Sequence, residues 1–209
     1  MEFRDVVRTR RMVRDYDPDR PVPAEVRDRL LEHAIRAPSA GFSQGWAFLV
    51  LETAEERDRF WTATTDGGTP DGWLTRMRRA PLLVVPMSHK AAYLDRYAEG
   101  DKGWADRDGA RWPVPYWDVD TGMAALLMLL TAVDEGLAAC FFGVPPERID
   151  GFRAAFGVPA GYTPIGCVSV GYAGAGDRRS PSLKRGRRGV GEVVHRGHWE
   201  EPAGRTAGG

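Results

Sequence analysis

The segment Trp117–Leu137 constrains the fold more than any other part of the chain. Its middle, Met123–Val133, reads MAALLMLLTAV and carries no charged residue. This run is too short to cross a bilayer, and a helix that is apolar on most faces has to be covered on most faces. We therefore predict a long, buried helix at the centre of a domain, around which the other elements pack.

Shorter amphipathic and apolar segments stand on both sides of this helix. Thr53 and Glu56 have the spacing of a capping box and begin one helix, and Pro38 stops another. Helices are expected at 2–14, at 23–37, from 53 onward and at 145–157, and strands at 46–51, 81–87, 138–142 and 163–172. Because no repeat or linker interrupts this order, we predict one domain of mixed α and β elements over residues 1–200 and a flexible tail at 201–209.

Residues 89–116 form a long region that fits neither periodicity. The region is rich in Trp, Tyr, Asp and Gly and short of aliphatic residues. Long structured loops tend to be functional, so we expect a lid or an excursion from the domain. Two interpretations of its aromatic residues stay open: they cover a substrate, or they pack in the core or at a dimer interface. The residues concerned are Trp104, Trp112, Tyr116 and Trp117.

The charge balance and the cysteines exclude several classes of protein. Lys plus Arg and Asp plus Glu both number 29, so no overall field attracts nucleic acid or an anionic membrane. The first 16 residues are charged throughout and lack the apolar core of a signal peptide, so we expect a cytoplasmic protein. Cys140 and Cys167 each lie in an apolar stretch and are expected to be core thiols. The four histidines have no metal-binding spacing with carboxylates, so no metal site is expected.

Two basic clusters stand near the ends of the chain, at Arg8–Arg14 and Lys184–Arg188. Arginine offers forked donors to phosphate, and the Arg11-to-Arg14 spacing lets neighbouring side chains converge at a helix end. Solvated charge is the alternative for both clusters, and a nucleic-acid patch is a further alternative for the second. An anionic ligand is therefore one reading of the two clusters.

The stretch RAPSAGFSQGW, Arg36–Trp46, combines many hydrogen-bonding groups with little side-chain bulk. Small residues leave backbone amides uncovered, and Gln44 adds an amide that can donate and accept. Such a segment can lie flat against a planar ligand with a polar edge, although a plain helix-to-strand loop has the same composition. No nucleophile elbow, HExxH motif, Walker loop or GxGxxG fingerprint is present, so the chemistry would have to come from a bound cofactor.

Taken in order along the chain, five segments resemble the nitroreductase superfamily of FMN-dependent oxidoreductases. They are RTRRMVRDYDPDRPVP, APSAGFSQGWAFLVL, DTGMAALLMLLTAVDEGL, FFGVPPERIDGFRAAFGVP and KRGRRGVGEVVHRGHW, and the resemblance covers roughly residues 3–199. The resemblance implies an α+β, nitroreductase-like fold with a central, mostly antiparallel sheet flanked by helices. It also implies an intertwined homodimer that binds FMN in two sites, each built from both chains.

The resemblance assigns roles to individual positions. The N-terminal positions and the late arginine pair correspond to those that hold the FMN phosphate and ribityl chain, the loop positions to those that line the isoalloxazine ring, and the 142–144 positions to a turn whose amide faces the reactive flavin nitrogen. The implied cofactor-binding residues are Arg10, Arg11, Met12, Arg14, Pro38, Ser39, Ala40, Phe42, Gln44, Phe142, Gly143, Val144, Arg185 and Arg187. Met12 stands where the family usually has serine, and Phe42 where it often has asparagine, which leaves the redox tuning and the substrate class open.

The activity implied by the resemblance is transfer of electrons from NAD(P)H, through FMN, to a nitroaromatic, a quinone or a similar small acceptor. No general base is expected, because protein groups would mainly orient and tune the ring. A flavin-cleaving synthase of dimethylbenzimidazole is an alternative, since SAGFSQGW keeps the Gly-Phe element of its ring loop. A flavin-binding protein with little turnover is another, and no residue selects dehalogenation or peptide-heterocycle oxidation.

Overall fold

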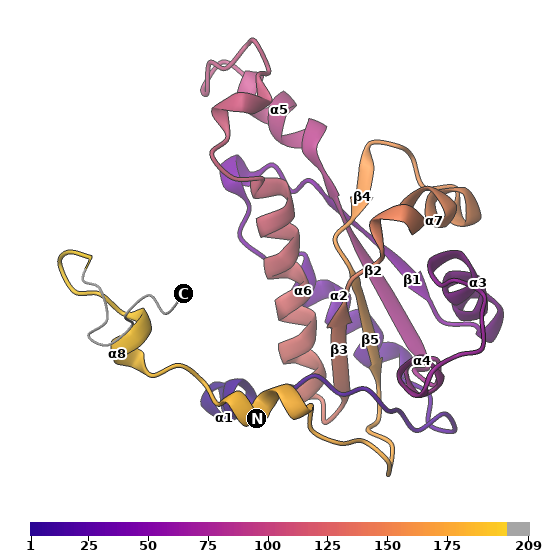
Figure 1. Cartoon of the computed structure of the whole chain (residues 1–209). Coiled ribbons are helices and arrows are strands. Elements are labelled where there is room, and N and C mark those ends of the chain that lie inside the picture. The colour runs from indigo at the N-terminus through magenta and orange to yellow at the C-terminus, as the bar shows by residue number, and fades with distance from the viewer. Residues whose placement is uncertain (200–209) are drawn as a thin grey trace, which may run out of the picture. The chain divides into compact units, whose positions relative to one another are not determined.

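Five strands form one antiparallel sheet in the computed structural model, which describes residues 1–199. The strands β1 (Trp46–Leu51), β2 (Leu82–His89), β5 (Cys167–Gly171) and β3 (Ala138–Phe142) follow one another across the sheet, and β4 (Tyr162–Pro164) pairs with the end of β2. Every one of these pairings is antiparallel. The predicted α+β fold with a mostly antiparallel sheet is confirmed (Figure 1).

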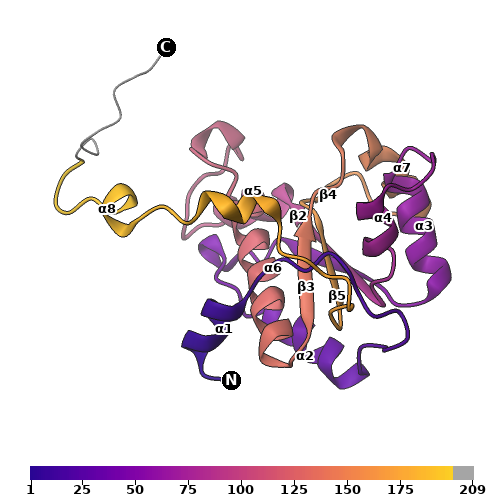
Figure 2. The same ribbon diagram turned by 60° about the horizontal axis from the view of Figure 1, so that its bottom comes forward.

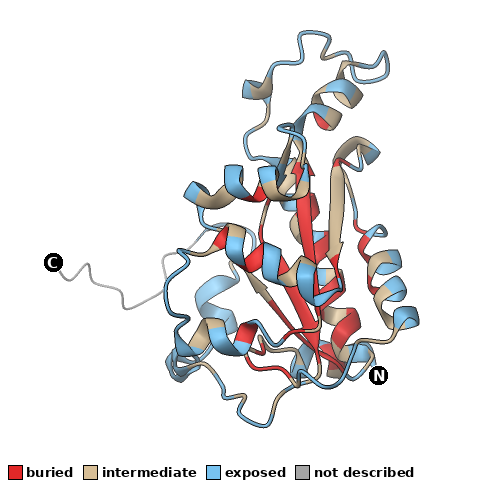
Figure 3. Cartoon of the chain, turned by 90° about the vertical axis from the view of Figure 1, so that its right-hand side faces the viewer, coloured by how far each residue is buried: buried red, intermediate tan, exposed pale blue. Residues whose placement is uncertain are grey.

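Helices cover both faces of the sheet because its strands are apolar on both faces. Leu82 and Val84 of β2 pack into the core beneath α2 (Ala24–Ala34) and α6 (Tyr116–Asp134). Their neighbour Leu83 faces the opposite core, beneath α3 (Ala54–Thr64), α4 (Gly72–Met77) and α7 (Ile149–Phe156). This alternation is the two-residue period of a strand buried on both sides. Figure 3 shows the buried residues along the central strands and the exposed residues on the outer helix surfaces.

The helix α6 contains the predicted apolar run and packs on the sheet, but within this chain it is not covered on most faces, because Met123 and Leu126 are 39% and 46% exposed. Most of its side chains that face the sheet are buried, among them Met128 and Leu129, and so are the polar residues Asp120 and Thr121. Within residues 1–199 it is the single helix whose length and composition would allow it to cross a membrane. A core helix of a water-soluble protein meets the same two criteria, so this property carries little weight.

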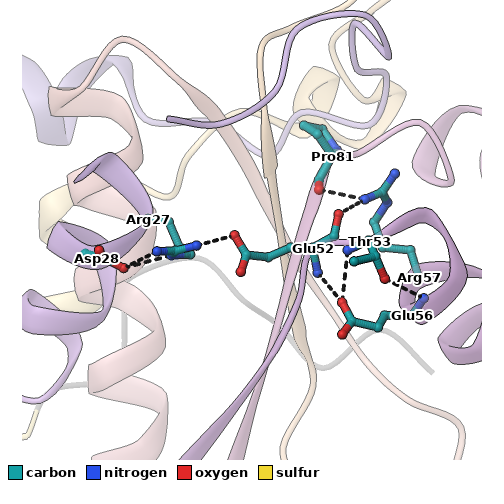
Figure 4. Close-up of polar contacts among 7 residues, drawn as sticks. All are labelled: Arg27, Asp28, Glu52, Thr53, Glu56, Arg57 and Pro81. Atoms are coloured by element: carbon teal, nitrogen blue, oxygen red, sulfur yellow. Dashed lines mark hydrogen bonds and ion pairs between the residues drawn. The ribbon is translucent and has the colours of Figure 1, made fainter. Parts of the chain in front are cut away.

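A polar network joins the helices of both faces at the end of β1 (Figure 4). Arg27 of α2 contacts the carboxylate of Glu52 at 2.5 Å. The predicted capping box is confirmed, because the Thr53 hydroxyl accepts from the Glu56 amide at 3.2 Å and the Glu56 carboxylate accepts from the Thr53 amide at 2.9 Å. Arg57 donates to the Pro81 carbonyl at 3.0 Å and so ties α3 to the start of β2.

The N-terminal segment differs from its prediction. The helix α1 (Phe3–Thr9) ends within the arginine cluster, at Thr9 instead of near Arg14, and Arg10 after it is extended. Met12 pairs in parallel with Ala139, and the Val13 amide donates to the Ala139 carbonyl at 3.0 Å. Because β3 is the last strand of the sheet, this pairing covers an open edge, and it buries Val13.

Other boundaries also differ. The region 89–116 contains two helical pieces, α5 (Lys90–Ala98) and the 3₁₀ turn η2 (Gly109–Arg111), which its composition did not suggest. The expected strand at 163–172 is split into β4 and β5 by Gly166, whose φ of 154° interrupts the pairing. Two further 3₁₀ turns, η1 (Ala40–Phe42) and η3 (Pro146–Arg148), precede β1 and α7.

The chain divides into two compact units, Met1–Arg178 and Arg179–Gly209. The described part of the second unit holds the 3₁₀ turn η4 (Pro181–Arg185) and the short helix α8 (Val190–Val193). The single domain over 1–200 stays a prediction, and the tail predicted at 201–209 lies outside the described residues.

Candidate functional site

The N-terminal basic segment is held in place by contacts with β3 and by the buried acid Asp177. The Phe141 amide donates to Met12 Sδ at 3.3 Å, and the Arg14 amide donates to Asp177 Oδ1 at 3.0 Å. The guanidinium of Arg11 forms an ion pair with the same Asp177, whose side chain is 3% exposed. The side chain of Arg11 is therefore engaged within the protein, and the backbone between residues 11 and 14 is held in a fixed path.

Arg10 differs from Arg11 in that one of its guanidinium nitrogens forms no hydrogen bond within residues 1–199. Its Nη1 is buried and has no hydrogen-bond partner among residues 1–199. Buried polar groups are nearly always hydrogen-bonded, and arginine N–H groups bind phosphate oxygens strongly. Arg14 Nη1 lies 3.4 Å from the Met12 carbonyl, which is a long contact for its charge. The residues present on this side fit the phosphate of a cofactor such as FMN.

The loop at 38–44 has a different kind of support. Gly41, Phe42 and Gln44 have φ values of 62°, 55° and 49°, in the left-handed region that favours glycine. The backbone N–H of Ala40 donates to Asp120 at 2.8 Å, and the backbone N–H of Gln44 donates to Ser39 Oγ at 2.8 Å. Pro38, Phe42 and Gln44 are exposed, Phe42 by 75%, so their side chains are presented outward.

The aromatic residues of the 89–116 excursion pack behind this loop. A Cβ added at Gly41 would lie 2.6 Å from the ring of Tyr97, and one added at Gly45 would lie 2.5 Å from the ring of Tyr93. Tyr97 in turn packs against Trp112 with ring centroids 4.6 Å apart, and Trp112 packs against Trp104 at 5.6 Å. These contacts support the packing interpretation of the excursion and explain why glycines occupy the two loop positions.

The turn after β3 borders a cavity of about 400 Å³. Phe142 stacks on Trp61 with centroids 5.4 Å apart and planes 10° apart, and Trp73 meets both rings edge-on. Gly143 is exposed, and a Cβ added to it would meet no atom within 4 Å. Val144 packs against the core and fixes the turn from below. The cavity is therefore lined by these aromatic residues on one side and by polar residues of the segment 64–71 on another, with an open backbone at Gly143.

The structure brings some of the predicted positions together and keeps others apart. The segment 10–14 and the turn 142–144 flank the same strand, β3. The loop 38–44 is bonded to Asp120, near the beginning of α6, whereas the N-terminal amine pairs with Asp134 at its end. These two acids are separated by about 21 Å of helix. Arg185 and Arg187 are exposed in the second unit, so their part in the site stays a prediction.

Sequence reasoning missed three buried polar residues that support these positions: Asp120, Tyr93 and Asp177. An acid inside an apolar helix was a readable signal for Asp120, because charged residues are rarely buried without a specific partner. Nothing local marked Asp177, which stands 166 residues from Arg11. Burial raises the pKa of the Cys140 and Cys167 thiols, which confirms that both are core residues and makes thiolate chemistry unfavourable.

Comparison with known proteins decides the family. The family model described as "Nitroreductase family" matches residues 7–172. This chain belongs to the nitroreductase family. A protein of Methanothermobacter thermautotrophicus with the provisional name NADH dehydrogenase/NAD(P)H nitroreductase is 26% identical over 82% of this chain and 78% of its own length.

Solved structures of nitroreductases share the fold. An FMN-dependent nitroreductase from Clostridium difficile superimposes with a TM-score of 0.68 at 22% identity, covering 93% of this chain and 98% of that protein. A provisionally named nitroreductase from Exiguobacterium sibiricum, solved in complex with FMN, superimposes with a TM-score of 0.63 at 22% identity, covering 90% of this chain and 98% of that protein. At these identities the likeness establishes the fold of this nitroreductase-family chain and leaves its ligand to be argued from its own residues.

Proposed function

We propose that this nitroreductase-family chain is an FMN-dependent oxidoreductase that passes electrons from NAD(P)H to a nitroaromatic, a quinone or a similar small organic acceptor. The observation that carries the proposal is the buried Arg10 Nη1, a donor without a partner among residues 1–199, on a segment fixed to the edge of the sheet. The names of the similar proteins, which include an FMN-dependent nitroreductase and a complex with FMN, support the same cofactor.

Arg10 and Arg14 would hold the phosphate end of the cofactor. Arg11 has a supporting role, because its ion pair with Asp177 fixes the backbone that carries the other two arginines. Met12 uses its sulfur to accept from the Phe141 amide, so a phosphate contact at this position would come from the backbone. A phosphate contact from Arg185 and Arg187 is implied by the family resemblance alone and stays a prediction.

The ring end of the cofactor would be held by the 38–44 loop of a second chain. Tyr116, Val119, Met123 and Leu126 form an apolar stripe along α6, and each is more than a third exposed. Helical neighbours at such spacing lie on one face, and an exposed apolar face of this length is typical of an interface. The helix α1 packs beside α6 (Figure 2), and its apolar residues Phe3 and Val7 are 72% and 49% exposed. These residues support a homodimer in which each site takes its arginines from one protomer and its loop from the partner.

FMN would supply the redox chemistry, because it can accept a hydride from one substrate and pass electrons to another. The chain would orient and tune it. The exposed turn at Gly143 can bring a backbone N–H to the edge of the ring without steric hindrance. The side chains of Phe42 and Gln44 would lie against the ring from the loop side. No side chain is assigned as a general base.

The acceptor is proposed to enter the cavity beside Gly143. Its lining includes the aromatic residues Trp61, Trp73 and Phe142, and apolar walls of this kind suit a planar aromatic molecule. A nitroaromatic or a quinone has this shape. The cavity lies next to the turn at which the reactive part of the ring would be held, as electron transfer to the acceptor requires.

The proposal is tested by an absorption spectrum of the freshly purified chain, followed by anaerobic addition of NADPH and then NADH. We expect a flavin band that bleaches with one or both donors and returns when a quinone is added. A bound flavin that neither donor reduces would favour a flavin-cleaving enzyme or a flavin-binding protein. A colourless protein that cannot take up added FMN would overturn the proposal.

A further inference from the structure

A buried acid supports the 38–44 loop from below. Asp120 lies on α6, and only 3% of its surface is exposed. Its Oδ2 accepts two hydrogen bonds of 2.8 Å, one from the Ala40 amide and one from the Tyr93 hydroxyl. A carboxyl group is costly to bury, and each of these donors offsets part of that cost. The acid thus joins α6 to the loop and to α5 at one oxygen atom.

Tyr93 continues the connection to the other end of the loop. The residue is fully buried, and its hydroxyl oxygen lies 3.3 Å from Ser39 Oγ. Ser39 Oγ in turn accepts from the backbone N–H of Gln44 at 2.8 Å. Burial raises the pKa of the Tyr93 phenol well above its ordinary value, so the hydroxyl stays protonated and remains a donor. One set of hydrogen bonds therefore reaches from α6 through α5 to both ends of the turn η1.

The loop needs such support because its backbone is strained. Phe42 and Gln44 have φ values of 55° and 49°, which residues with a side chain rarely adopt, and they stand within four positions of each other. Strained conformations persist only when the surrounding structure fixes them. Arg96 adds one further contact, since its Nε donates to the Gly41 carbonyl at 2.9 Å.

We propose that Asp120 and Tyr93 are positioning residues that hold the 38–44 loop in the shape in which it lines the isoalloxazine ring. The inference rests on the proposed function. It also divides the loop into two sets of residues. Ser39 and Ala40 use their polar groups inside the protein and anchor the loop, whereas the side chains of Phe42 and Gln44 are exposed and are left to face the cofactor.

The test compares full-length Asp120→Ala, Asp120→Asn and Tyr93→Phe with the unmodified chain. Asparagine keeps an oxygen that can accept the same two hydrogen bonds, and phenylalanine keeps the buried ring. Asp118→Ala is the matched control, because Asp118 is an acid on the same helix that accepts instead from Ser88 Oγ at 2.6 Å. Two quantities are measured: hydrogen exchange of the peptide 36–46 in protein freed of flavin, and the dissociation constant and absorption spectrum of added FMN.

We expect both Asp120→Ala and Tyr93→Phe to speed exchange in 36–46. Tyr93→Phe should weaken FMN binding by about tenfold, the effect of one lost hydrogen bond to a buried group, and Asp120→Ala should weaken it by at least as much, because it removes two. The double variant should be little worse than the more affected single variant, because both act on one network. Asp120→Asn should recover most of the affinity, and Asp118→Ala should change neither quantity.

The exchange measurement separates this inference from the proposed function, because it needs no cofactor. If the unmodified chain binds no FMN, the proposed function fails, while faster exchange in the variants would still show that the network holds the loop. If exchange in 36–46 is unchanged, the network does not support the loop and the inference is overturned. The inference would also be overturned if exchange became faster while the FMN affinity stayed within twofold of the unmodified chain and the spectrum did not change, because the loop would then not position the ring.

Discussion

The two polar regions that this chain would offer to a cofactor are built in opposite ways. The segment 10–14 is held by its own pairing with β3 and by bonds from the Arg14 amide and the Arg11 guanidinium to Asp177, and among residues 1–199 the Arg10 Nη1 has no hydrogen-bond partner. The loop 38–44 is held by side chains, through Asp120, Tyr93 and Arg96, and its buried polar groups are already occupied. The segment 10–14 therefore positions a charged side chain, and the loop 38–44 is a strained backbone that neighbouring side chains hold in place.

This difference indicates what each region can bind. A buried guanidinium donor that has no partner among residues 1–199 suits an anion, whereas a loop with exposed Phe42 and Gln44 suits a planar group with polar edges. Both would be needed for FMN, which has a phosphate at one end and a ring at the other. The segment 10–14 pairs with β3, whereas the loop 38–44 is bonded to Asp120 near the beginning of α6, and we propose that the two halves of one site come from two chains.

The largest effect is expected from Leu126→Glu in the apolar stripe of α6. Leu126 is 46% exposed, and a carboxylate placed in an apolar interface loses its water. We expect a cost of about 3 kcal/mol or more, which corresponds to roughly a 100-fold loss of dimer and of FMN affinity. Size-exclusion chromatography with light scattering would measure the mass, and fluorescence titration the FMN affinity.

The control for this variant is Ile35→Glu, because Ile35 is 53% exposed at the end of α2 and lies outside the stripe. It should remain a dimer that binds FMN. A Leu126→Glu protein that stays dimeric, or an unmodified chain that binds FMN tightly as a monomer, would contradict the division of the site between two chains.

Arg10→Ala should act on the phosphate end alone. Loss of hydrogen bonds to a charged group costs about 2 kcal/mol, so FMN affinity should fall roughly 30-fold. Riboflavin lacks the phosphate, and its affinity should be unchanged. Arg8→Ala is the control, because the Arg8 side chain is 75% exposed. An equal loss for FMN and riboflavin would show that Arg10 supports the fold instead of the phosphate.

Gly45→Ala should disturb the loop with its packing. The new Cβ would lie 2.5 Å from the ring of Tyr93 and 2.8 Å from the His89 carbonyl oxygen, and that oxygen belongs to the backbone and cannot rotate away. Overpacking of this kind costs roughly 1–3 kcal/mol, so thermal unfolding should shift down by several degrees. Gly68→Ala, where a Cβ meets no atom within 4 Å, should melt like the unmodified chain. Equal melting temperatures for both variants would mean that the loop is not tightly packed.

The smallest effect is expected far from both regions, in Thr53→Ala. Loss of the cap of α3 costs about 1 kcal/mol and should lower the melting temperature by roughly 2–4 °C. FMN affinity should be unchanged, because Thr53 touches neither region. Thr69→Ala, at an exposed loop position, is the control. A clear loss of FMN affinity in Thr53→Ala would show that general stability, and not the two regions, sets the affinity.

The sequence predicted those elements whose signals are local. Thr53 and Glu56 form the expected capping box, and Gly157 ends α7 with a φ of 63°. The apolar run around Met123 correctly predicted a long helix packed on the core, although within this chain only the face toward the sheet is buried. The antiparallel arrangement of the sheet was predicted from the resemblance to the nitroreductases, because the sequence of a single strand does not show how it pairs.

The parts that the sequence did not predict depend on distant partners. The residues around Met12 are extended because they pair with β3, which stands about 130 residues later. Arg10 and Arg11 are neighbours with the same side chain. Arg11 is paired because Asp177 lies beside it, whereas Arg10 Nη1 has no partner within residues 1–199. The roles of Asp120 and Tyr93 likewise became visible only when α5 and α6 were seen to meet beneath the loop.

The most direct test of the account mixes two defective chains. Arg10→Ala removes the phosphate donor, and Gly41→Val should spoil the loop, because its Cβ would lie 2.6 Å from Tyr97 at a backbone φ of 62°. The two chains are co-expressed with different tags, mixed dimers are isolated by both tags, and bound FMN is counted. If each site takes its arginines from one chain and its loop from the other, one site of every mixed dimer contains both defects and the other contains none. The account therefore predicts one tightly bound FMN per mixed dimer although neither parent dimer retains the cofactor; mixed dimers that bind none would contradict it.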